Sequence, residues 1–335
     1  MPDCRVVGSI SLYAPNPGGL RRWIMETLVP TILLFFCLPT TTAAWDDLGH
    51  MIVAASAYDQ LTPVAREKVS TLLKLNPNYG KWVAHVPKQD MDRVAFVRAS
   101  RWPDDIKVGP AYKQDGRHNG NRPSGRKAAQ NIGYTDKLQH KYWHFINLPF
   151  SPDNTRLVDP PTPNAKTQIA LFRKTLQSPT SGNYLKSYDL VWLMHLVADV
   201  HQPLHATSRF DKAHKKGDDG GNGVTVCSHP CETNETLHAF WDHILGLSED
   251  PKTAIDTAKQ LSQVDPQLAS ISDEGIWIKE SFETAQTHVY VSPIEVGLGP
   301  YKLTESYKAA ARELANRRMA LAGTRLANLL NDVLK

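Results

Sequence analysis

Apolar residues recur at helical spacing along most of this chain, and the segment 190–205 shows the pattern most clearly. Its apolar positions follow one helical repeat as far as Ala198, and Pro203 then interrupts the helix. Thr62 followed by Pro63 is a typical helix start, a capping hydroxyl and then proline at the first helical position. The repeat predicts helical segments at 50–58, 62–75, 90–102, 165–178, 186–200, 236–247 and 303–334, and two more between 251 and 290.

The segments between these helices are rich in turn-forming residues. Residues 108–139 contain many Gly, Lys, Arg and Asn residues and predict a long surface loop, and 149–164 is a second, proline-rich loop. Glycines crowd 217–223, which indicates tight turns or close backbone approach, and 224–227 is a candidate short strand. We therefore expect one mainly α-helical (all-α) domain at 45–335, with a minor short strand or hairpin and long loops.

Residues 1–44 have the composition of a secretory signal peptide rather than of folded structure. The basic pair Arg21-Arg22 precedes the apolar run 28–38, and small residues follow as far as Ala44. The run is too short to predict a transmembrane helix, and no later segment approaches one. Cleavage after Ala44 would make Trp45 the mature N-terminus, of a protein exported to the periplasm or secreted.

Composition and charge exclude some classes of function. The chain has 335 residues, of which 41% are hydrophobic and 21% charged, as in an ordinary soluble protein. Its net charge of +4 gives no broad basic surface for nucleic acid, so any nucleic-acid chemistry must come from a local site. We expect a monomer with no stable membrane association and no obligate protein partner.

Signal cleavage would leave only two cysteines in the mature chain. Cys227 and Cys231 are separated by three residues, and in an exported protein they predict one local disulfide bond. A zinc-binding role for the two thiols is the alternative. Asn234 begins a glycosylation sequon, which has meaning only in a eukaryotic source.

Two His-x3-Asp pairs carry the strongest chemical signal. His195 and Asp199 are four residues apart on a predicted helix, so they share one face, and His238 and Asp242 repeat the arrangement. His205 follows the break at Pro203. Imidazole and carboxylate together suit zinc, although a buried hydrogen-bonded His–Asp pair is the alternative. Further candidates, each of which is alternatively an ordinary core or surface residue, are His50, Asp104 and His144.

Together these motifs resemble the zinc-dependent single-strand nucleases and 3′-nucleotidases of the S1/P1 type, in the superfamily of zinc-dependent phospholipase C. The resemblance covers essentially the whole mature chain, and all nine expected ligand positions are filled in order. The motifs are Trp45 with His50 five residues on, Trp102-Pro103-Asp104, Trp143-His144-Phe145, the run from His195 to His205, Gly220-Gly221-Asn222, and the run from Leu237 to Asp242.

The resemblance implies three zinc ions. Asp104, His144, His195 and Asp199 would bind one ion. Asp199 would bridge to a second, held also by His50 and by the free amino group and carbonyl of Trp45. The third would be bound by His205, His238 and Asp242. A backbone amine can ligate zinc only as a free N-terminus, so this ligand set requires cleavage after Ala44.

The resemblance also implies the reaction, hydrolysis of single-stranded DNA, single-stranded RNA and 3′-nucleotides. A hydroxide shared by the zinc ions that Asp199 bridges would attack phosphorus, and the third ion would stabilise the leaving 3′-oxygen, so products carry 5′-phosphates. Lys107 matches a family lysine that neutralises phosphate charge, with a solvated surface lysine as the alternative. Phe145 would stack on a base, unless it is a core residue, and Asn222 would line the base pocket.

Three positions depart from the fungal members of the family. Asn147 replaces an aspartate, and its amide both donates and accepts hydrogen bonds, so base preference should not be carried over. Pro149 replaces a second aspartate that some members have. His243, after Asp242, is larger than expected and would narrow or re-aim the site. None of the three is a predicted metal ligand.

Two other functions remain as alternatives. Zinc-dependent phospholipase C has the same metal scheme, but the spacing from Trp45 to His50 and an aspartate rather than glutamate at Asp242 match the nuclease branch. A secreted zinc-binding protein without catalysis is the second alternative. Lys107 and Phe145 argue against it, because a metal store needs neither a phosphate lysine nor a base platform.

Overall fold

Many helices begin where the sequence supplies a capping side chain followed by proline. The Thr62 hydroxyl accepts a hydrogen bond from the Ala65 amide, 3.2 Å away, at the start of α2. Asp250 and Asp265 cap α9 and α10 in the same way, and each is followed directly by proline. Such caps contribute about 1 kcal/mol each by satisfying amides that have no partner in the first turn.

The structure is a computed structural model that describes residues 45–335, except 117–125 and 229–233. The predicted signal peptide and Cys231 of the predicted disulfide lie outside the described residues.

The α-helices are α1 Asp47–Asp59, α2 Pro63–Leu73, α3 Tyr79–Trp82, α4 Met91–Ala99, α5 Trp102–Val108, α6 Ala165–Gln177, α7 Asn183–Asp199, α8 Leu237–Asp242, α9 Pro251–Ala258, α10 Pro266–Ser270, α11 Glu274–Thr284 and α12 Glu305–Val333. Short 3-10 turns are η1 Lys88–Asp90, η2 Arg126–Ala129, η3 Gly133–Thr135, η4 Lys141–Trp143 and η5 Pro203–Ala206, and a π-helical turn, η6, spans Ala285–Val289.

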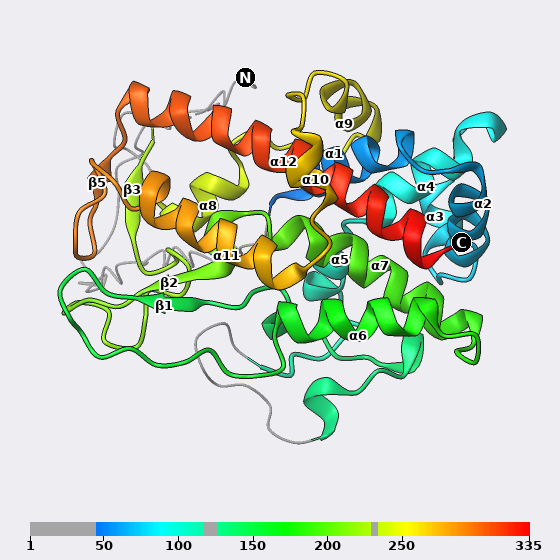
Figure 1. Ribbon diagram of the computed structural model, residues 1–335, viewed down its shortest axis with the longest axis horizontal. Helices are drawn as coiled ribbons and strands as arrows, with labels where there is room; N and C mark the ends of the chain where they lie inside the picture. Colours follow the sequence, from blue (N-terminus) through cyan, green and yellow to red (C-terminus); the bar gives the residue numbers. More distant parts are fainter. Residues whose placement is uncertain (1–44, 117–125, 229–233) are drawn as a thin grey trace, which may run out of the picture. The chain divides into compact units, whose positions relative to one another are not determined.

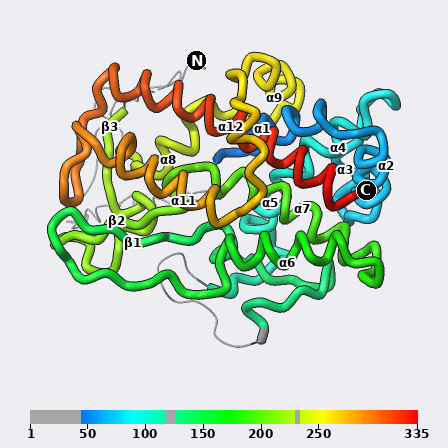
Figure 2. Tube along the Cα trace, in the orientation of Figure 1, coloured from blue at the N-terminus to red at the C-terminus, as the bar shows by residue number. Residues whose placement is uncertain are grey.

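Helix α7 lies at the centre of the fold. Every residue from Ser187 to Asp199 is buried, so this helix faces protein on all sides. It packs against α2, α5, α6 and α12, while α1 packs against α4, α9 and α12 (Figures 1 and 2). The polar residues of α7 are therefore held inside the core, where each requires a partner.

Two small sheets complete the architecture. Strands β1 (Leu148–Phe150) and β2 (Thr207–Arg209) pair in parallel, with Leu148 opposite Thr207. Strand β3 (Thr225–Cys227) lies between antiparallel β4 (Glu235–Thr236) and parallel β5 (Tyr301–Lys302). In Figure 1 these strands lie toward the left of the view, and α2 to α4 toward the right. The mainly helical class predicted from the sequence is confirmed.

Several predicted boundaries are wrong. The segment 90–102 is not one helix: α4 ends at Ala99, and Pro103 starts α5 because a proline is tolerated in a first turn but not in a helix interior. The helix predicted at 236–247 ends at Asp242, before a turn in which Gly246 has a φ of +109°. Between 251 and 290 there are three α-helices rather than two, since Pro266 begins α10.

The predicted surface loop at 108–139 is also partly wrong. Ala128 and Asp136 are each 2% exposed, and Gln139 is 7% exposed. The polar composition of this segment misled the prediction, because some of its polar groups are paired inside the protein rather than solvated. Asn131, for example, donates a hydrogen bond of 2.7 Å to Asp189 of α7.

No helix in the described part of the chain is long and apolar enough to cross a membrane. Asn234 is exposed, and its glycosylation stays a prediction.

Candidate metal centre

Eight of the predicted ligand side chains gather into three buried groups that could each hold a metal ion. Within each group, one ligand atom from every residue lies within 4.8 Å of the others. The residues come from five separate elements and one adjoining segment: His50 from α1, Asp104 from α5, His195 and Asp199 from α7, His205 from η5, His238 and Asp242 from α8, and His144 from the residue after η4. The groups are His50, His195 and Asp199; Asp104, His144 and His195; and His205, His238 and Asp242.

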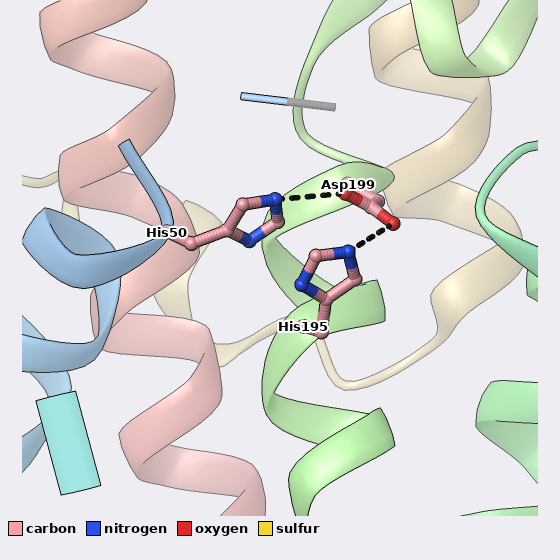
Figure 3. A group of neighbouring side chains, drawn as sticks. All are labelled: His50, His195 and Asp199. Carbon is pink, nitrogen blue, oxygen red and sulfur yellow. Dashed lines mark ion pairs between the residues drawn. The ribbon is translucent and has the colours of Figure 1, made fainter. Parts of the chain in front are cut away.

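The first group forms where α1 meets α7 (Figure 3). His195 Nε2 lies 3.3 Å from Asp199 Oδ2, one helical turn away, as the four-residue spacing predicts. His50 Nε2 lies 3.3 Å from the other oxygen, Asp199 Oδ1. One carboxylate therefore faces two imidazoles through its two oxygens, the geometry expected of a bridging ligand.

The second group shares His195 with the first. His144 Nδ1 lies 2.9 Å from His195 Nε2 and 3.1 Å from Asp199 Oδ2. Asp104 Oδ1 lies 3.6 Å from His195 Nε2. Asp104 reaches the others because α5 begins as a new helix at Trp102, three residues after α4 ends.

The third group lies beyond the break at Pro203. Helix α7 ends at Asp199, and η5 begins at Pro203 and carries His205, as the sequence indicates. His205 Nε2 lies 3.1 Å from His238 Nε2, which lies 3.4 Å from Asp242 Oδ2. The second His-x3-Asp pair thus shares a helix face like the first.

Backbone carbonyls determine which ring nitrogen faces each group. The Nδ1 atoms of His195, His205 and His238 donate to the carbonyls of Ser100, His144 and Gly220, at 2.7, 2.8 and 2.7 Å. A neutral imidazole has one N–H, so each Nε2 presents a lone pair. The lone pairs of His205 and His238 then face each other, which is unfavourable unless a cation lies between them.

Burial keeps these imidazoles neutral in the metal-free chain. It lowers the pKa of His195 and of His205 well below the usual range, and lowers the pKa of His238 to about 4. Burial also raises the pKa of Asp199 to about 7. Neutral imidazoles are the form that ligates zinc.

The carboxylates complete the fit to a metal. In the described part of the chain, Asp199 Oδ1 and Asp242 Oδ2 are buried and accept no hydrogen bond. Buried polar atoms nearly always have such a partner, so these two oxygens point to an ion. Histidine nitrogens combined with carboxylate oxygens form the donor set that zinc takes. The residues present therefore fit zinc.

Lys107 is buried, so it is not the solvated surface lysine that the sequence left as an alternative. Only 7% of it is exposed, and its Nζ lies 2.5 Å from Asp104 Oδ1. The lysine lies one turn from Asp104 on α5, which places a fixed positive charge at the edge of the second group.

Trp45 folds back against the same centre. Its indole Nε1 donates to the Ala198 carbonyl at 3.1 Å, and the next amide, of Asp46, donates to the Asp242 carbonyl at 3.1 Å. A Cβ on Gly49 would lie 2.7 Å from Trp45 Cβ, so a glycine is needed where the chain folds over α1. These contacts place Trp45 beside two ligand-bearing segments. Ligation by its amino group stays a prediction.

Two of the predicted base-binding residues, Asn147 and Asn222, contact the same aspartate, Asp219. The Asn147 amide nitrogen is 3.4 Å from Asp219 Oδ1, and Asn222 Nδ2 donates to the Asp219 carbonyl at 2.9 Å. Asn147 and Asp219 have φ values of +53° and +56°, a conformation that Asn and Asp tolerate better than most residues. Phe145 is 6% exposed, and its stacking role stays a prediction.

The sequence did not single out two residues that hold predicted site residues in place. Gln202 Nε2 donates to Asp242 Oδ1 at 2.8 Å, and Asp219 contacts both predicted base-pocket amides. Gln202 lies inside the quoted run from His195 to His205, so its position among ligands was a signal for it. Asp219 gave no signal beyond its place in the glycine-rich segment.

Comparison with known proteins agrees with the resemblance that the sequence motifs indicate. The model of the S1/P1 nuclease family matches residues 45–335. Endonuclease 3 of Arabidopsis thaliana is 25% identical over 338 aligned residues, which cover 94% of this chain and 96% of that protein. Endonuclease 4 of Arabidopsis thaliana is 28% identical over 240 aligned residues, which cover 68% of this chain and 62% of that protein.

Proposed function

Because this chain belongs to the S1/P1 nuclease family, we propose that it is an exported, zinc-dependent endonuclease. It would cleave single-stranded DNA and RNA to 5′-phosphorylated products, and it would also remove 3′-phosphates from nucleotides. The observation that carries the proposal is the set of three buried His/Asp groups with lone pairs and carboxylate oxygens facing one another. A nuclease of this family with these donors intact has the ligands that metal-assisted hydrolysis needs.

Each group would hold one zinc ion. Asp199 would link the first two groups, since its two oxygens face His50 and His195 separately. When bound, the zinc ions would supply an ionised water near neutral pH and would neutralise charge on the phosphate and on the leaving oxygen. No protein side chain then has to act as a general acid.

The chain's own residues bind and orient the substrate. Lys107 would contact the phosphate, because its buried ammonium lies beside Asp104 and carries a charge that hydration does not screen. Phe145 would stack on one base, and Asn147 and Asn222 would contact its edge. A base can make these contacts only when it is unstacked, which favours single strands over duplex.

Export and the active centre depend on the same cleavage in this proposal. Removal of residues 1–44 would free the amino group of Trp45 as a zinc ligand. Two findings support it: the family model begins at Trp45, and the Trp45 indole and the following amide bond to the chain beside Asp199 and Asp242.

The test is hydrolysis by protein that starts at Trp45. Single-stranded DNA, single-stranded RNA, duplex DNA, a 3′-nucleotide and phosphatidylcholine are each supplied with zinc, and again with a chelator. We expect chelator-sensitive cleavage of single strands at a rate well above that of duplex, with 5′-phosphate ends.

Two results would contradict the proposal in different ways. Turnover of phosphatidylcholine without cleavage of nucleic acid would indicate a phospholipase C. Zinc binding without turnover of any substrate would indicate a zinc-binding protein with no catalytic function.

A further inference from the structure

The buried histidine His140, like His201 and His214, belongs to none of the three metal-binding groups. It is 0% exposed, and both of its ring nitrogens face a carboxylate. Nε2 lies 2.9 Å from Asp136 Oδ2, and Nδ1 lies 3.0 Å from Asp115 Oδ2. A neutral imidazole has one N–H and can donate to only one of the two carboxylates, so this geometry favours a doubly protonated ring.

The charges around His140 agree with that protonation state. Burial lowers the pKa of His140, but the hydrogen bonds and charges of Asp115 and Asp136 outweigh it and raise the pKa above its usual value. Burial likewise raises the pKa of Asp115, and the hydrogen bonds and charge of His140 then lower it below its usual value. Among the described residues, Tyr142 also faces the ring: its hydroxyl lies 3.0 Å from Nδ1 and donates to Asp115 at 2.7 Å.

The same contacts hold the backbone of His140 in an unusual conformation. Its φ is +46°, in the left-handed region, which costs a residue with a side chain about 1–3 kcal/mol and persists only where the surroundings hold it. The His140 amide donates to Asp115 Oδ1 at 2.8 Å, and the ring stacks on Trp143 with centroids 3.6 Å apart. Asp115 therefore holds both the amide and the ring.

On each side of His140 the chain reaches the metal centre. Gln139 donates from Nε2 to the Lys107 carbonyl at 2.9 Å. On the other side, Trp143 stacks on His140 and directly precedes His144. His140 is thus linked through its neighbours to the backbone of Lys107 and to the residue before His144.

We propose that His140, Asp115 and Asp136 form a charged clamp that positions the ligand His144 and the lysine Lys107 at the metal centre. The positioning role rests on the proposed function, whereas the charge on the ring does not. His140 is a positioning residue, since its described links to the centre run through Trp143 and Gln139.

The clamp gives a pH dependence of defined sign. The folded-state pKa of His140 is raised above its usual 6.5, so its contribution is fully present below that pH and is lost as the pH rises through the folded-state value. We therefore expect the clamp to weaken on the alkaline side, where the zinc-ligating imidazoles are already neutral.

The first test observes the ring directly, by 15N NMR of the imidazoles in the Trp45-to-Lys335 protein. We expect one histidine to keep the signals of a doubly protonated ring above pH 6.5, and these signals to be missing from His140→Gln. A His140 ring that is singly protonated at pH 6.5 would overturn the charged clamp.

The second test measures positioning, as the zinc retained per chain in competition with a chelator from pH 6 to pH 9. His140→Gln should weaken the binding of one ion by less than the roughly 10–100-fold that loss of a ligand's direct hydrogen-bond partner costs, because His140 acts through Trp143 and Gln139, and this deficit should shrink as the pH rises. Asp136→Asn, which removes one acceptor and keeps the histidine, should give a smaller deficit. The matched control is His85→Gln, another left-handed histidine, but an exposed one, and it should retain zinc like the wild type.

The outcomes separate the two proposals. Wild-type zinc retention in both His140→Gln and Asp136→Asn, or an equal deficit at every pH, would overturn the positioning role. A wild-type protein that binds no zinc would overturn the proposed function and the positioning role with it, and the NMR signals would still decide whether the clamp is charged.

Discussion

Replacing Gln202 with methionine should selectively weaken the third metal-binding group. Gln202 is 0% exposed, and its Nε2 donates to Asp242 Oδ1 at 2.8 Å, which leaves Oδ2 to face His238. Its Oε1 also accepts from the Leu204 amide, in the turn that carries His205. Methionine has a similar length and fits a buried apolar space, but it can make neither bond.

The magnitude follows from the bond that is lost. A hydrogen bond to a charged group contributes about 1.5–3 kcal/mol, and each 1.4 kcal/mol corresponds to a factor of ten. The zinc affinity of the third group should therefore fall about 10–100-fold, the range found for partners of metal ligands generally. The Gln202 amide also donates to the carbonyl of Asp199, at 2.9 Å, but this backbone bond survives the substitution, so the other two groups should keep their ions.

The assay is the zinc content per chain after equilibration in a series of zinc buffers, followed by thermal unfolding of the metal-free protein. Gln168→Met, in α6, is the matched control, since Gln168 is also buried, 1% exposed, but contacts no ligand. Three ions bound to Gln202→Met with wild-type affinities would refute this account of Asp242. Loss of all three at once would show that the substitution damages the fold instead.

Three other predictions test separate parts of the protein. Phe145→Ala should slow cleavage of single-stranded DNA at least tenfold more than cleavage of a small phosphodiester without a base, because stacking contributes about 1–3 kcal/mol. Equal losses of rate on both substrates would show that Phe145 does not stack on a base. One extra residue retained before Trp45 should reduce zinc content and activity together, and full activity would contradict the N-terminal ligand. Glu280→Gln should lower the free energy of unfolding by about 3 kcal/mol at pH 7, because it leaves the fully buried Arg325 without its bidentate partner. Burial raises the pKa of Glu280, but Arg325 and Arg318 lower it below the usual 4.5, so this difference should be present above pH 4.5 and shrink as the pH falls further; a constant difference from pH 7 to pH 3 in urea unfolding would rule it out.

The sequence predicted those parts of the site that depend on local geometry. Four residues on a helix make about one turn, so the facing of His195 and Asp199 followed from spacing alone. The turn after Asp199 followed from Pro203, because proline cannot continue a helix. The convergence of His50 and His144 on these residues depends on tertiary packing, and it was accessible only through the resemblance to a known family.

The sequence could not predict the polar groups that are paired across the fold. Asp136 and Gln139 lie in a segment whose composition is that of a solvated loop, yet both are buried because they bond to His140 and to the Lys107 backbone. The amino-acid composition of a segment indicates only whether it could be solvated, whereas its burial depends on hydrogen-bond partners far away in the chain. The same limit applies to Gln202, whose partner Asp242 is forty residues away.

The glycine-rich segment 217–223 has a consequence for how such an enzyme can diversify. Its Gly220 carbonyl orients the ligand His238, and a Cβ at Gly220 would lie 2.5 Å from the Leu204 carbonyl, so the backbone there tolerates almost no change. The side chains of Asp219 and Asn222, on the same short segment, are half-exposed beside Asn147. Selection for a new base preference could therefore vary the side chain at position 222, and at position 219 among residues that accept its left-handed φ of +56°, but not the backbone of the segment. Substitutions, rather than insertions or deletions, are the changes that directed evolution should recover from this segment.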